Sequence, residues 1–561
     1  MNKKNFIFLL SLFLLNLIFR VNIIIATRNH IPTNFDINLS PKNILVGSYT
    51  GGRSHLKPML DIAAILIERG HNVIMLSSGN YTPASEYPTI KQISMGPPLN
   101  VKNTRDSARL IVQAEFDYII LAKIFESSVQ SYKSTYEIYK DTAIDNNIDL
   151  FICYAMFNDA CLDVAHALKK PVVGFMSFLY VIDAQTYKSD PVFRCNISLE
   201  NESFLERFKC TIIRPLHIIS LLHTPLNQIN DLRNQMNIEP VYMSFRRLLR
   251  TSLVFIDTFF GLELPQALPS NVQEIGPIIS KDYPPLTPEL SNFMNVHERV
   301  LYIAFGGRFF TTTENNNKIL QSIIEIINKN MIDGVIWALV MTSKNDFSPT
   351  LNLSNGLQVQ TSSILNNEHP HIRITNFAPQ FAVLNHTNTK LFFSHGGAGS
   401  IHESLFTGTP MLVLPIGGDQ MGNAQKLKSA GVALSLNKFT LDVNDIITKI
   451  NFLLNDNDVK KNVDRMKVLA KINSKRKYRA ADLIEYILHR GSSNQELKEL
   501  IPADKRMGFI RGNNYDVYIT LLGIVLGFIV VILRITFKLI RFFVFFVRII
   551  SPYSDQKPKR E

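Results

Sequence analysis

Short apolar runs alternate with longer amphipathic stretches through the first half of the chain. The run at residues 43–48 (NILVGS) precedes a stretch with apolar residues at helical spacing, which closes at Gly70 ahead of a second run at residues 71–78 (HNVIMLSS). A run, a helix-spaced stretch and a second run predict a βαβ unit. The same pattern predicts further strands at residues 150–153 and 171–177 around a helix at residues 160–168.

The alternation starts again in the second half of the chain. Between the halves, the stretch from Gly276 to Leu290 is dense in proline, which is typical of a linker. Beyond it, apolar runs with strand character lie at residues 300–307, 335–341, 371–376 and 390–394. Two α/β halves predict two doubly wound domains, which we place at residues 27–280 and 281–495.

An apolar segment stands near each end of the chain. Lys3 and Lys4 precede an apolar run, which predicts a secretory signal peptide over residues 1–26, with a retained signal anchor as the alternative. Near the other end, residues 517–533 (VYITLLGIVLGFIVVIL) are uncharged and long enough to cross a thin bilayer. We predict a transmembrane helix there, after a juxtamembrane segment at residues 496–516.

The remaining residues, 534–561, form a basic tail, which argues for the cytoplasmic side of a membrane. The aromatic stretch RFFVFFVRII is either an interfacial amphipathic helix or an extension of the span. Lys557 and Lys559 have the arrangement of a dilysine endoplasmic-reticulum retrieval signal, although signals this short also arise by chance. We therefore expect a single-pass type I protein of the endoplasmic-reticulum membrane with a lumenal body.

Charge and cysteine content narrow the class of protein. Much of the net charge of +12 lies in the tail, and the body has no basic stripe with interleaved aromatics, so we expect no nucleic-acid partner. The four cysteines lack metal-ligand spacing. Cys195 and Cys210 are candidates for a lumenal disulfide, whereas Cys153 and Cys161 are interpreted as buried thiols.

Lumenal placement also predicts a glycoprotein. N-glycosylation sequons without an intervening proline begin at Asn38, Asn80, Asn196, Asn201, Asn352 and Asn385.

A glycine turn after an apolar run carries the first candidate chemistry. The run KLFFS at residues 390–394 is followed by Gly396, Gly397 and Gly399, and a helix is predicted from about Ser400 to Thr407. A strand, a glycine turn and a helix N-terminus place backbone N–H groups where a diphosphate can bind. His395, at the strand tip, can donate to the same anion.

Polar side chains nearby suit a sugar nucleotide. Glu403 lies about one turn into the predicted helix, where a carboxylate can accept both hydroxyls of a ribose. Asp419 and Gln420 follow the next apolar run, MLVLPI, and from that strand end they can bind sugar hydroxyls.

In order and spacing, this window resembles the signature of the UDP-glycosyltransferase family, in its membrane-bound eukaryotic form. The matching residues are Phe377-Ala378-Pro379-Gln380, His395-Gly396-Gly397, Ser400, Glu403 and Asp419-Gln420. The resemblance implies the GT-B fold, in which two Rossmann-like domains face a cleft, the first binding the acceptor and the second the UDP-sugar.

The same resemblance implies a role for each donor-binding residue. Phe377 would stack on uracil, Gln380 would bind the base or the ribose, and Glu403 would bind the ribose. His395 and Ser400, with the turn at Gly397, would hold the pyrophosphate, and Asp419 and Gln420 would hold the sugar. Two positions depart from the family pattern, since Phe377 stands where Trp is usual and Gly399 where relatives often have Asn. We expect the smaller ring to weaken base stacking and the Gly399 N–H to replace a side-chain contact.

His55 is the candidate catalytic base. It follows the first predicted strand in the loop GGRSH, at a helix N-terminus, where the dipole favours a neutral imidazole. In the family this base has an aspartate partner, but Tyr154 stands at the aligned position. Asp159 could serve if its loop folds back, or it could simply favour the helix N-terminus; Asp163 is interpreted as exposed or capping.

We therefore expect an inverting transferase that moves a hexose from a UDP-sugar to a hydroxyl of a small lipophilic, lipid or sterol acceptor. No metal and no cofactor are expected, because N–H dipoles and the imidazole stabilise the leaving UDP. The alternative, suggested by Tyr154, Phe377 and Gly399, is a membrane-anchored, catalytically impaired UDP-sugar-binding or scaffold protein. Homo-oligomer formation is left open.

Overall fold

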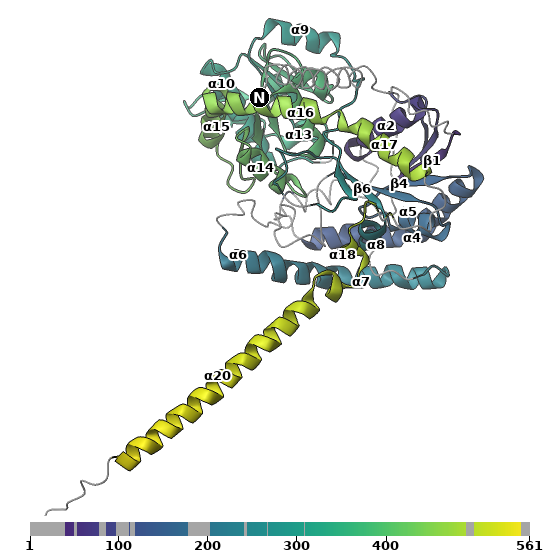
Figure 1. Ribbon diagram of the computed structural model, residues 1–561. Coiled ribbons are helices and arrows are strands. Elements are labelled where there is room, and N and C mark those ends of the chain that lie inside the picture. Colours follow the sequence, from purple (N-terminus) through teal and green to yellow (C-terminus); the bar gives the residue numbers. More distant parts are fainter. Residues whose placement is uncertain are drawn as a thin grey trace, which may run out of the picture. The chain divides into compact units, whose positions relative to one another are not determined.

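The computed structural model describes most of the chain between Ser40 and Ile550 (Figure 1). The described residues are 40–49, 53–77, 86–96, 112, 118–177, 202–239, 244–265, 268–307, 309–489, 497 and 499–550. The predicted signal peptide, the dilysine motif and the sequons at Asn38, Asn80, Asn196 and Asn201 lie outside them.

The first sheet has seven parallel strands in the order β3-β2-β1-β4-β5-β6-β7. They are β1 (Asn43–Ser48), β2 (Asn72–Ser77), β3 (Lys91–Ser94), β4 (Leu150–Tyr154), β5 (Val172–Met176), β6 (Leu253–Ile256) and β7 (Val272–Glu274). The chain builds outward from β1 to one edge and then from β4 to the other. The strand order therefore reverses between β1 and β4, the place where open α/β sheets bind ligands beyond the strand ends.

Alternate side chains of β1 enter two different cores, as the period of a strand requires. Leu45 packs in a core with α4 (Tyr118–Asp145), α5 (Asp159–Ala167) and α7 (Arg214–Gln235). Ile44 and Val46 face the opposite core, with α2 (Arg53–Glu68) and α17 (Arg476–His489). Helices on both faces explain why these strands read as continuous apolar runs.

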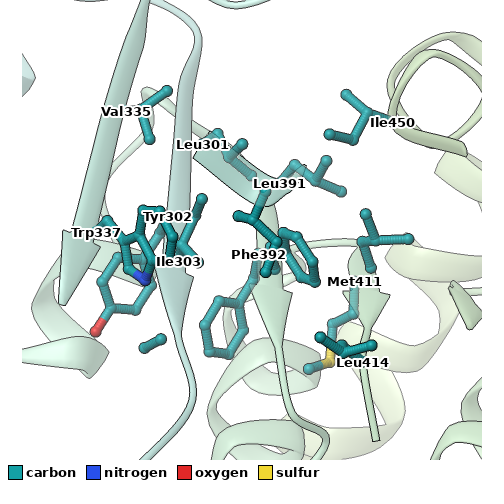
Figure 2. Close-up of a cluster of buried hydrophobic side chains, with 14 of the residues drawn as sticks. Leu301, Tyr302, Ile303, Val335, Trp337, Leu391, Phe392, Met411, Leu414 and Ile450 are labelled. Carbon is teal, nitrogen blue, oxygen red and sulfur yellow. The ribbon is translucent and has the colours of Figure 1, made fainter. Parts of the chain in front are cut away.

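The second sheet has six parallel strands in the order β12-β9-β8-β13-β14-β15. They are β8 (Val300–Ala304), β9 (Gly334–Ala338), β12 (Ile372–Thr375), β13 (Thr389–Ser394), β14 (Met411–Val413) and β15 (Ala433–Ser435). Here the order reverses between β8 and β13. Figure 2 shows the core around these two strands, where the Tyr302 and Phe392 rings stack with centroids 5.1 Å apart.

Helices of the second half alternate with its strands. They are α9 (Pro288–Val296), α10 (Thr313–Asn328), α11 (Thr361–Leu365), α12 (Gln380–Leu384), α13 (Ala398–Thr407), α14 (Gln420–Ser429), α15 (Val443–Asn455) and α16 (Asn457–Asn473), with a hairpin of β10 (Thr350–Asn352) and β11 (Gln358–Gln360). The predicted strands and the glycine turn with its helix are confirmed. Two parallel sheets with covering helices confirm the predicted pair of Rossmann-like domains, whose exact limits stay a prediction.

Helix α17 follows the second sheet in sequence but packs in the core of the first. Ala480 and Ile484 are fully buried against β1 and α2. At the edge of this contact Arg69 donates to Asp482 at 2.8 Å and to Glu485 at 2.6 Å. The end of the α/β body therefore stabilises its beginning.

The stretch between Leu179 and Phe260 is helical where it is described. It contains α6 (Phe204–Phe208), a π-helix (Lys209–Ile213), α7 and α8 (Ser244–Thr251). Helix α7 is packed along its length through Ile218, Leu222, Leu226 and Ile229, whereas no residue of α6 or the π-helix is buried. This stretch is therefore packed along α7 and exposed along α6 and the π-helix.

The C-terminal segment forms one continuous helix, α20 (Tyr515–Ile550), after the short α18 (Ala503–Arg506) and α19 (Phe509–Gly512). By length and composition α20 can cross a membrane, with a mean hydropathy of 2.6 in its most apolar window and none of that window buried. It runs beyond the predicted span of residues 517–533. The aromatic stretch RFFVFFVRII therefore extends the same helix rather than starting a new one.

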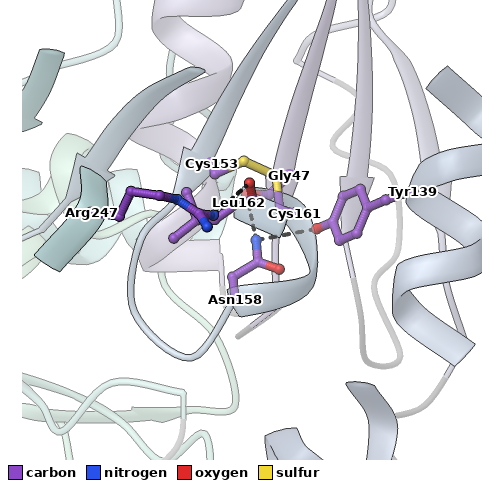
Figure 3. The surroundings of a disulfide bond; sticks show 7 residues. All are labelled: Gly47, Tyr139, Cys153, Asn158, Cys161, Leu162 and Arg247. Carbon is purple, nitrogen blue, oxygen red and sulfur yellow. Dashed lines mark hydrogen bonds between the residues drawn. A yellow bond between two sulfur atoms is a disulfide. The ribbon is translucent and has the colours of Figure 1, made fainter. Parts of the chain in front are cut away.

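One interpretation of the cysteines is wrong. Cys153 at the end of β4 and Cys161 in α5 form a disulfide, so they are not thiols (Figure 3). Both are fully buried, and apolar runs on either side hid a pairing that depends on how α5 folds back on β4. Cys210 is also disulfide-bonded, whereas its predicted partner Cys195 lies outside the described residues.

Candidate active site

The predicted donor residues gather at the reversal of strand order in the second sheet. His395 follows β13, and Gly306 follows β8, the adjacent strand. A Cβ atom on Gly306 would lie 2.9 Å from the His395 ring, and one on Gly397 would lie 2.7 Å from Nε2. Gly306 also has a φ of +72°, a backbone conformation that residues with a Cβ atom rarely adopt. The two glycines thus enclose the imidazole closely.

This enclosure determines the charge of His395. The side chain is buried, and its burial lowers the pKa of His395 to about 4, against the opposing effect of a hydrogen bond with the Ala304 carbonyl. The imidazole is therefore neutral near pH 7. It presents a dipole rather than a positive charge to an anion.

The N-terminus of α13 supplies further donors. Gly397 is the N-cap, and the first intrahelical bond runs from the Ile401 N–H to the Gly397 carbonyl. The N–H groups of Ala398, Gly399 and Ser400 precede that bond and have no acceptor within the helix. Gly399 therefore has its N–H where the sequence suggested, in the positive end of the helix dipole.

Three of the predicted donor residues are already joined by hydrogen bonds. Gln380, the first residue of α12, donates from Nε2 to Glu403 Oε2 at 2.8 Å and to Ser400 Oγ at 3.1 Å. Glu403 and Ser400 lie on one face of α13, three residues apart. Phe377, three residues before Gln380, is 59% exposed, so its ring is open to stacking.

Asp419 and Gln420 lie at the start of α14, after β14. Gln420 Oε1 accepts from the N–H groups of Ile416 and Gly417 at 2.8 and 3.0 Å, which leaves its amide nitrogen as a donor. Asp419 Oδ2 accepts from Asn423 at 2.7 Å, and burial raises the pKa of this carboxyl in spite of that bond. Asn423 also donates to the Gly396 carbonyl at 3.1 Å and so joins α14 to the glycine turn.

His55 lies at the corresponding reversal in the first sheet. It is in the first turn of α2, after β1, and its Nδ1 is 2.8 Å from the Tyr154 hydroxyl at the end of β4. Ser177 Oγ, just beyond β5, lies 3.4 Å from the same nitrogen. The rings of His55 and Tyr154 meet edge to face, with centroids 5.2 Å apart.

Asp159 contacts a different group. Its Oδ1 accepts from Arg233 at 3.1 Å, and Arg233 also donates to Asp163 at 2.7 Å. Asp159 further lines a small cavity with Tyr49, Tyr132 and Asn158. The catalytic role of Asp159 stays a prediction. Tyr154, which stands where the resemblance leads us to expect an aspartate, contacts His55 Nδ1 instead.

The interpretation of Asp163 as exposed or capping is wrong. Its side chain is buried, and it accepts from Tyr132, Arg233 and Arg247 at 2.8, 2.7 and 2.9 Å. Arg233 lies on α7, far along the chain, so nothing in the sequence near Asp163 indicates the pairing. Burial of an aspartate is tolerated here because two arginines compensate its charge.

Sequence reasoning did not identify Gly306, Asn423 and Ser177 as parts of these sites. A signal existed for two of them, since Gly306 belongs to the glycine pair that ends the run VLYIAFGG and Ser177 ends PVVGFMS. Carboxyl ends of parallel strands meet at one edge of a sheet, so polar or glycine residues at those ends are candidates. Asn423 carries no such signal, because its role depends on the position of α14.

The strand orders and the two sites define a class of protein, the GT-B glycosyltransferases. The glycosyltransferase of kitacinnamycin matches with a TM-score of 0.55 at 16% identity, over 80% of this chain and 99% of that one. The calicheamicin glycosyltransferase CalG4 matches with a TM-score of 0.53 at 16% identity, over 81% and 99%. At this identity the matches show the fold, and they confirm the prediction of GT-B architecture.

The chain belongs to the UDP-glucuronosyl and UDP-glucosyl transferase family, whose model matches residues 44–548. UDP-glycosyltransferase 1 of Phaeomoniella chlamydospora is 32% identical over 425 residues, 72% of this chain and 84% of that protein. A UDP-glycosyltransferase of Talaromyces amestolkiae is 28% identical, over 86% and 94%. Human UDP-glucuronosyltransferase 2B15 is 23% identical, over 86% and 90%. The protein is accordingly a transferase that uses UDP-sugar donors, as its signature predicted.

Proposed function

We propose that the protein transfers a hexose from a UDP-sugar to a hydroxyl group of a lipophilic small molecule, lipid or sterol. The observation that carries the donor half is the cluster of Gln380, Ser400 and Glu403, which the fold assembles beside the N-terminus of α13. A carboxylate, an amide and a hydroxyl with free backbone N–H groups suit ribose and diphosphate together.

In the proposed mechanism His55 removes the proton of the acceptor hydroxyl as its oxygen attacks the anomeric carbon. The C–O bond to UDP breaks on the opposite face, so the configuration of the sugar inverts. The negative charge that forms on the departing diphosphate is stabilised by the N–H groups of Ala398, Gly399 and Ser400 and by the dipole of α13. Because these donors are part of the fold, we propose that no divalent cation is required, and full turnover in a chelator tests this.

A lipophilic acceptor is supported by apolar surface in the first half of the chain. Phe204, Phe208, Ile212 and Leu216 recur every fourth residue along α6, the π-helix and α7, and each is exposed. This spacing gathers them on one side of the helix, with Arg207 and Arg214 elsewhere on its surface. Such a helix suits contact with a lipid surface, from which an apolar acceptor can enter.

The chain also suits a lumenal position in the endoplasmic reticulum, with α20 as a single type I membrane anchor. Support comes from the length of α20, the basic residues behind it and the buried Cys153–Cys161 disulfide, which an oxidising compartment favours. Among the described sequons, Asn352 and Asn385 are exposed. A shift in mass after endoglycosidase treatment, lost in Asn352→Gln and Asn385→Gln variants, tests this placement.

The test of the activity is turnover of several UDP-sugars with a mixed set of lipophilic alcohols, followed by mass spectrometry of the products. We expect a hexosylated product and UDP in equal amounts. His55→Ala should lower kcat by about 100-fold or more, the usual contribution of a general base, while UDP binding is retained. His166→Ala, on the half-exposed side of α5, is the matched control and should remain active.

The competing function is a UDP-sugar-binding protein without turnover, which Tyr154, Phe377 and Gly399 favour. It predicts UDP binding by calorimetry without product from any alcohol tested. Turnover that is unchanged in His55→Ala would instead contradict the assignment of the base and leave the transferase activity intact.

A further inference from the structure

Three polar side chains, those of His55, Tyr154 and Ser177, contact one another at the strand ends of the first sheet. Tyr154 ends β4 and is 1% exposed, and Ser177 follows the neighbouring strand β5 and is 6% exposed. The Tyr154 hydroxyl donates to Ser177 Oγ at 3.3 Å, and the same hydroxyl lies 2.8 Å from His55 Nδ1. A buried group of this kind must distribute its few protons in a definite way.

The proton of Tyr154 decides the arrangement. A phenol has one proton, and here it points to Ser177. The hydrogen in the 2.8 Å contact between the two rings must then come from His55 Nδ1, with the tyrosine oxygen as acceptor. A neutral imidazole protonated on Nδ1 carries its lone pair on Nε2, the form that a general base needs.

We propose that Tyr154, held by Ser177, is the positioning residue that replaces the usual aspartate partner of the base and keeps His55 in the Nδ1–H form. This inference rests on the proposed function only for its effect on turnover, since the position of the proton is a property of the free protein. Tyr154 differs from a carboxylate in one respect. It accepts the Nδ1–H bond without adding a negative charge to stabilise the imidazolium that forms during transfer.

Ser177 has a specific part in this arrangement. If Ser177 is removed, the Tyr154 proton loses the acceptor observed at 3.3 Å and can turn toward His55 Nδ1. That nitrogen would then accept, Nε2 would carry the proton, and the base would be in the inactive tautomer. A residue that lies 3.4 Å from the imidazole therefore controls which nitrogen is basic.

The proposal is tested by a double-mutant cycle on the full chain, with Tyr154→Phe, Ser177→Ala and the double variant. Tyr154→Phe keeps the ring packing, and we expect it to lower kcat by roughly 10- to 100-fold with KM for the UDP-sugar unchanged. Ser177→Ala should lower kcat by at least a similar factor. The double variant should be no slower than Ser177→Ala, because without the phenol no proton can be turned toward Nδ1.

A purely structural role gives a different result. Tyr154→Phe would then leave kcat and its pH profile unchanged, or, if both single variants lowered kcat, their losses would multiply in the double variant. Either result overturns the proposal. Thr258→Val, at another buried hydroxyl near the end of a strand of this sheet, is a matched control for loss of a buried hydroxyl and should not change the pH profile.

A direct reading of the tautomer separates this proposal from the proposed function. Histidine labelled with ¹⁵N in the full chain, with His55 assigned by its loss in His55→Gln, should show a protonated Nδ1 in the wild type. It should show a protonated Nε2 in Ser177→Ala. An Nε2–H form in the wild type would overturn the inference even in an active enzyme. An Nδ1–H form would support it even if no acceptor were turned over.

Discussion

The two sheets present their candidate sites at the same topological position, but they assemble them from the chain in different ways. In the second sheet, the donor residues come from one window between Phe377 and Gln420, on consecutive elements. In the first sheet, the contacts of His55 are with Tyr154 and Ser177, which lie 99 and 122 positions away in the chain. A local window has a recognisable spacing, whereas a contact between distant strands depends on the fold.

The electrostatic design also differs between the two sites. The donor site encloses a neutral imidazole, His395, between two glycines and leaves its anion donors on the backbone. The first half of the chain instead buries charge, where Arg233 is paired with Asp159 and Asp163. We expect stability to depend on charged pairs in the first half, and ligand binding to depend on unpaired donors in the second.

The largest effect is expected from Asp163→Asn. The change removes a negative charge that two arginines share, and Arg233 has no exposed side-chain surface through which water can compensate. Loss of one partner of a buried ion pair costs about 3–5 kcal/mol in the free energy of unfolding. Denaturant unfolding followed by tryptophan fluorescence and circular dichroism measures this cost.

Asp159→Asn is the matched control for that prediction, because Asp159 contacts the same arginine but is partly exposed. We expect less than half the loss of stability, with kcat unchanged. A fall in kcat at unchanged stability would instead support the predicted catalytic role of Asp159. Equal destabilisation by the two variants would contradict the difference in burial.

The next effect concerns the pH dependence of stability in the second half. The pKa of His395 is about 4 in the folded protein and about 6.5 in an unfolded chain. Between these values the unfolded chain binds more protons, so the contribution of the buried imidazole is complete above pH 6.5 and is lost as the pH falls toward 4. The loss is up to about 3 kcal/mol.

Unfolding free energies measured from pH 7 to pH 4 should therefore fall less steeply in His395→Gln, which cannot take up that proton. If the variant and the wild type have parallel pH profiles, burial does not hold His395 neutral. The same series on a variant of the exposed His166 should reproduce the wild-type slope.

The two regions also show how far sequence alone reaches. The strands around His395 were predictable because apolar runs, glycine turn and helix follow each other directly, and the proximity of Gln380 to Glu403 followed from the resemblance. The disulfide of Cys153 was not predictable, because the sequence of an apolar run does not show whether its cysteine is a thiol or forms a disulfide. The burial of Asp163 was hidden for a related reason, since its compensating charge comes from α7.

A smaller effect is expected from Glu403→Gln in the donor site. The carboxylate accepts from Gln380 at 2.8 Å and is the proposed acceptor for the ribose hydroxyls. A hydrogen bond to a charged group contributes about 1.5–3 kcal/mol, so UDP should bind roughly 10- to 100-fold more weakly. Calorimetry with UDP alone tests this without reference to any acceptor. Unchanged UDP affinity would remove Glu403 from the donor site, while a parallel loss in Tyr154→Phe would contradict the separation of the two sites.

The smallest effect is a gain of affinity from Phe377→Trp. Phe377 is exposed and stands where the family usually has tryptophan, whose larger ring covers more of a stacked base. We expect UDP to bind about 2-fold more tightly, or about 0.5 kcal/mol, a fraction of the full stacking energy of a base on an aromatic ring.

Phe377→Leu is the opposing control and should weaken binding, because a leucine has no π-face. UMP retains the base of UDP but lacks one phosphate. If the ring acts on uracil, each substitution should therefore change the affinity for UMP and the affinity for UDP by the same factor. A change confined to UDP would place the effect at the diphosphate and contradict the stacking role.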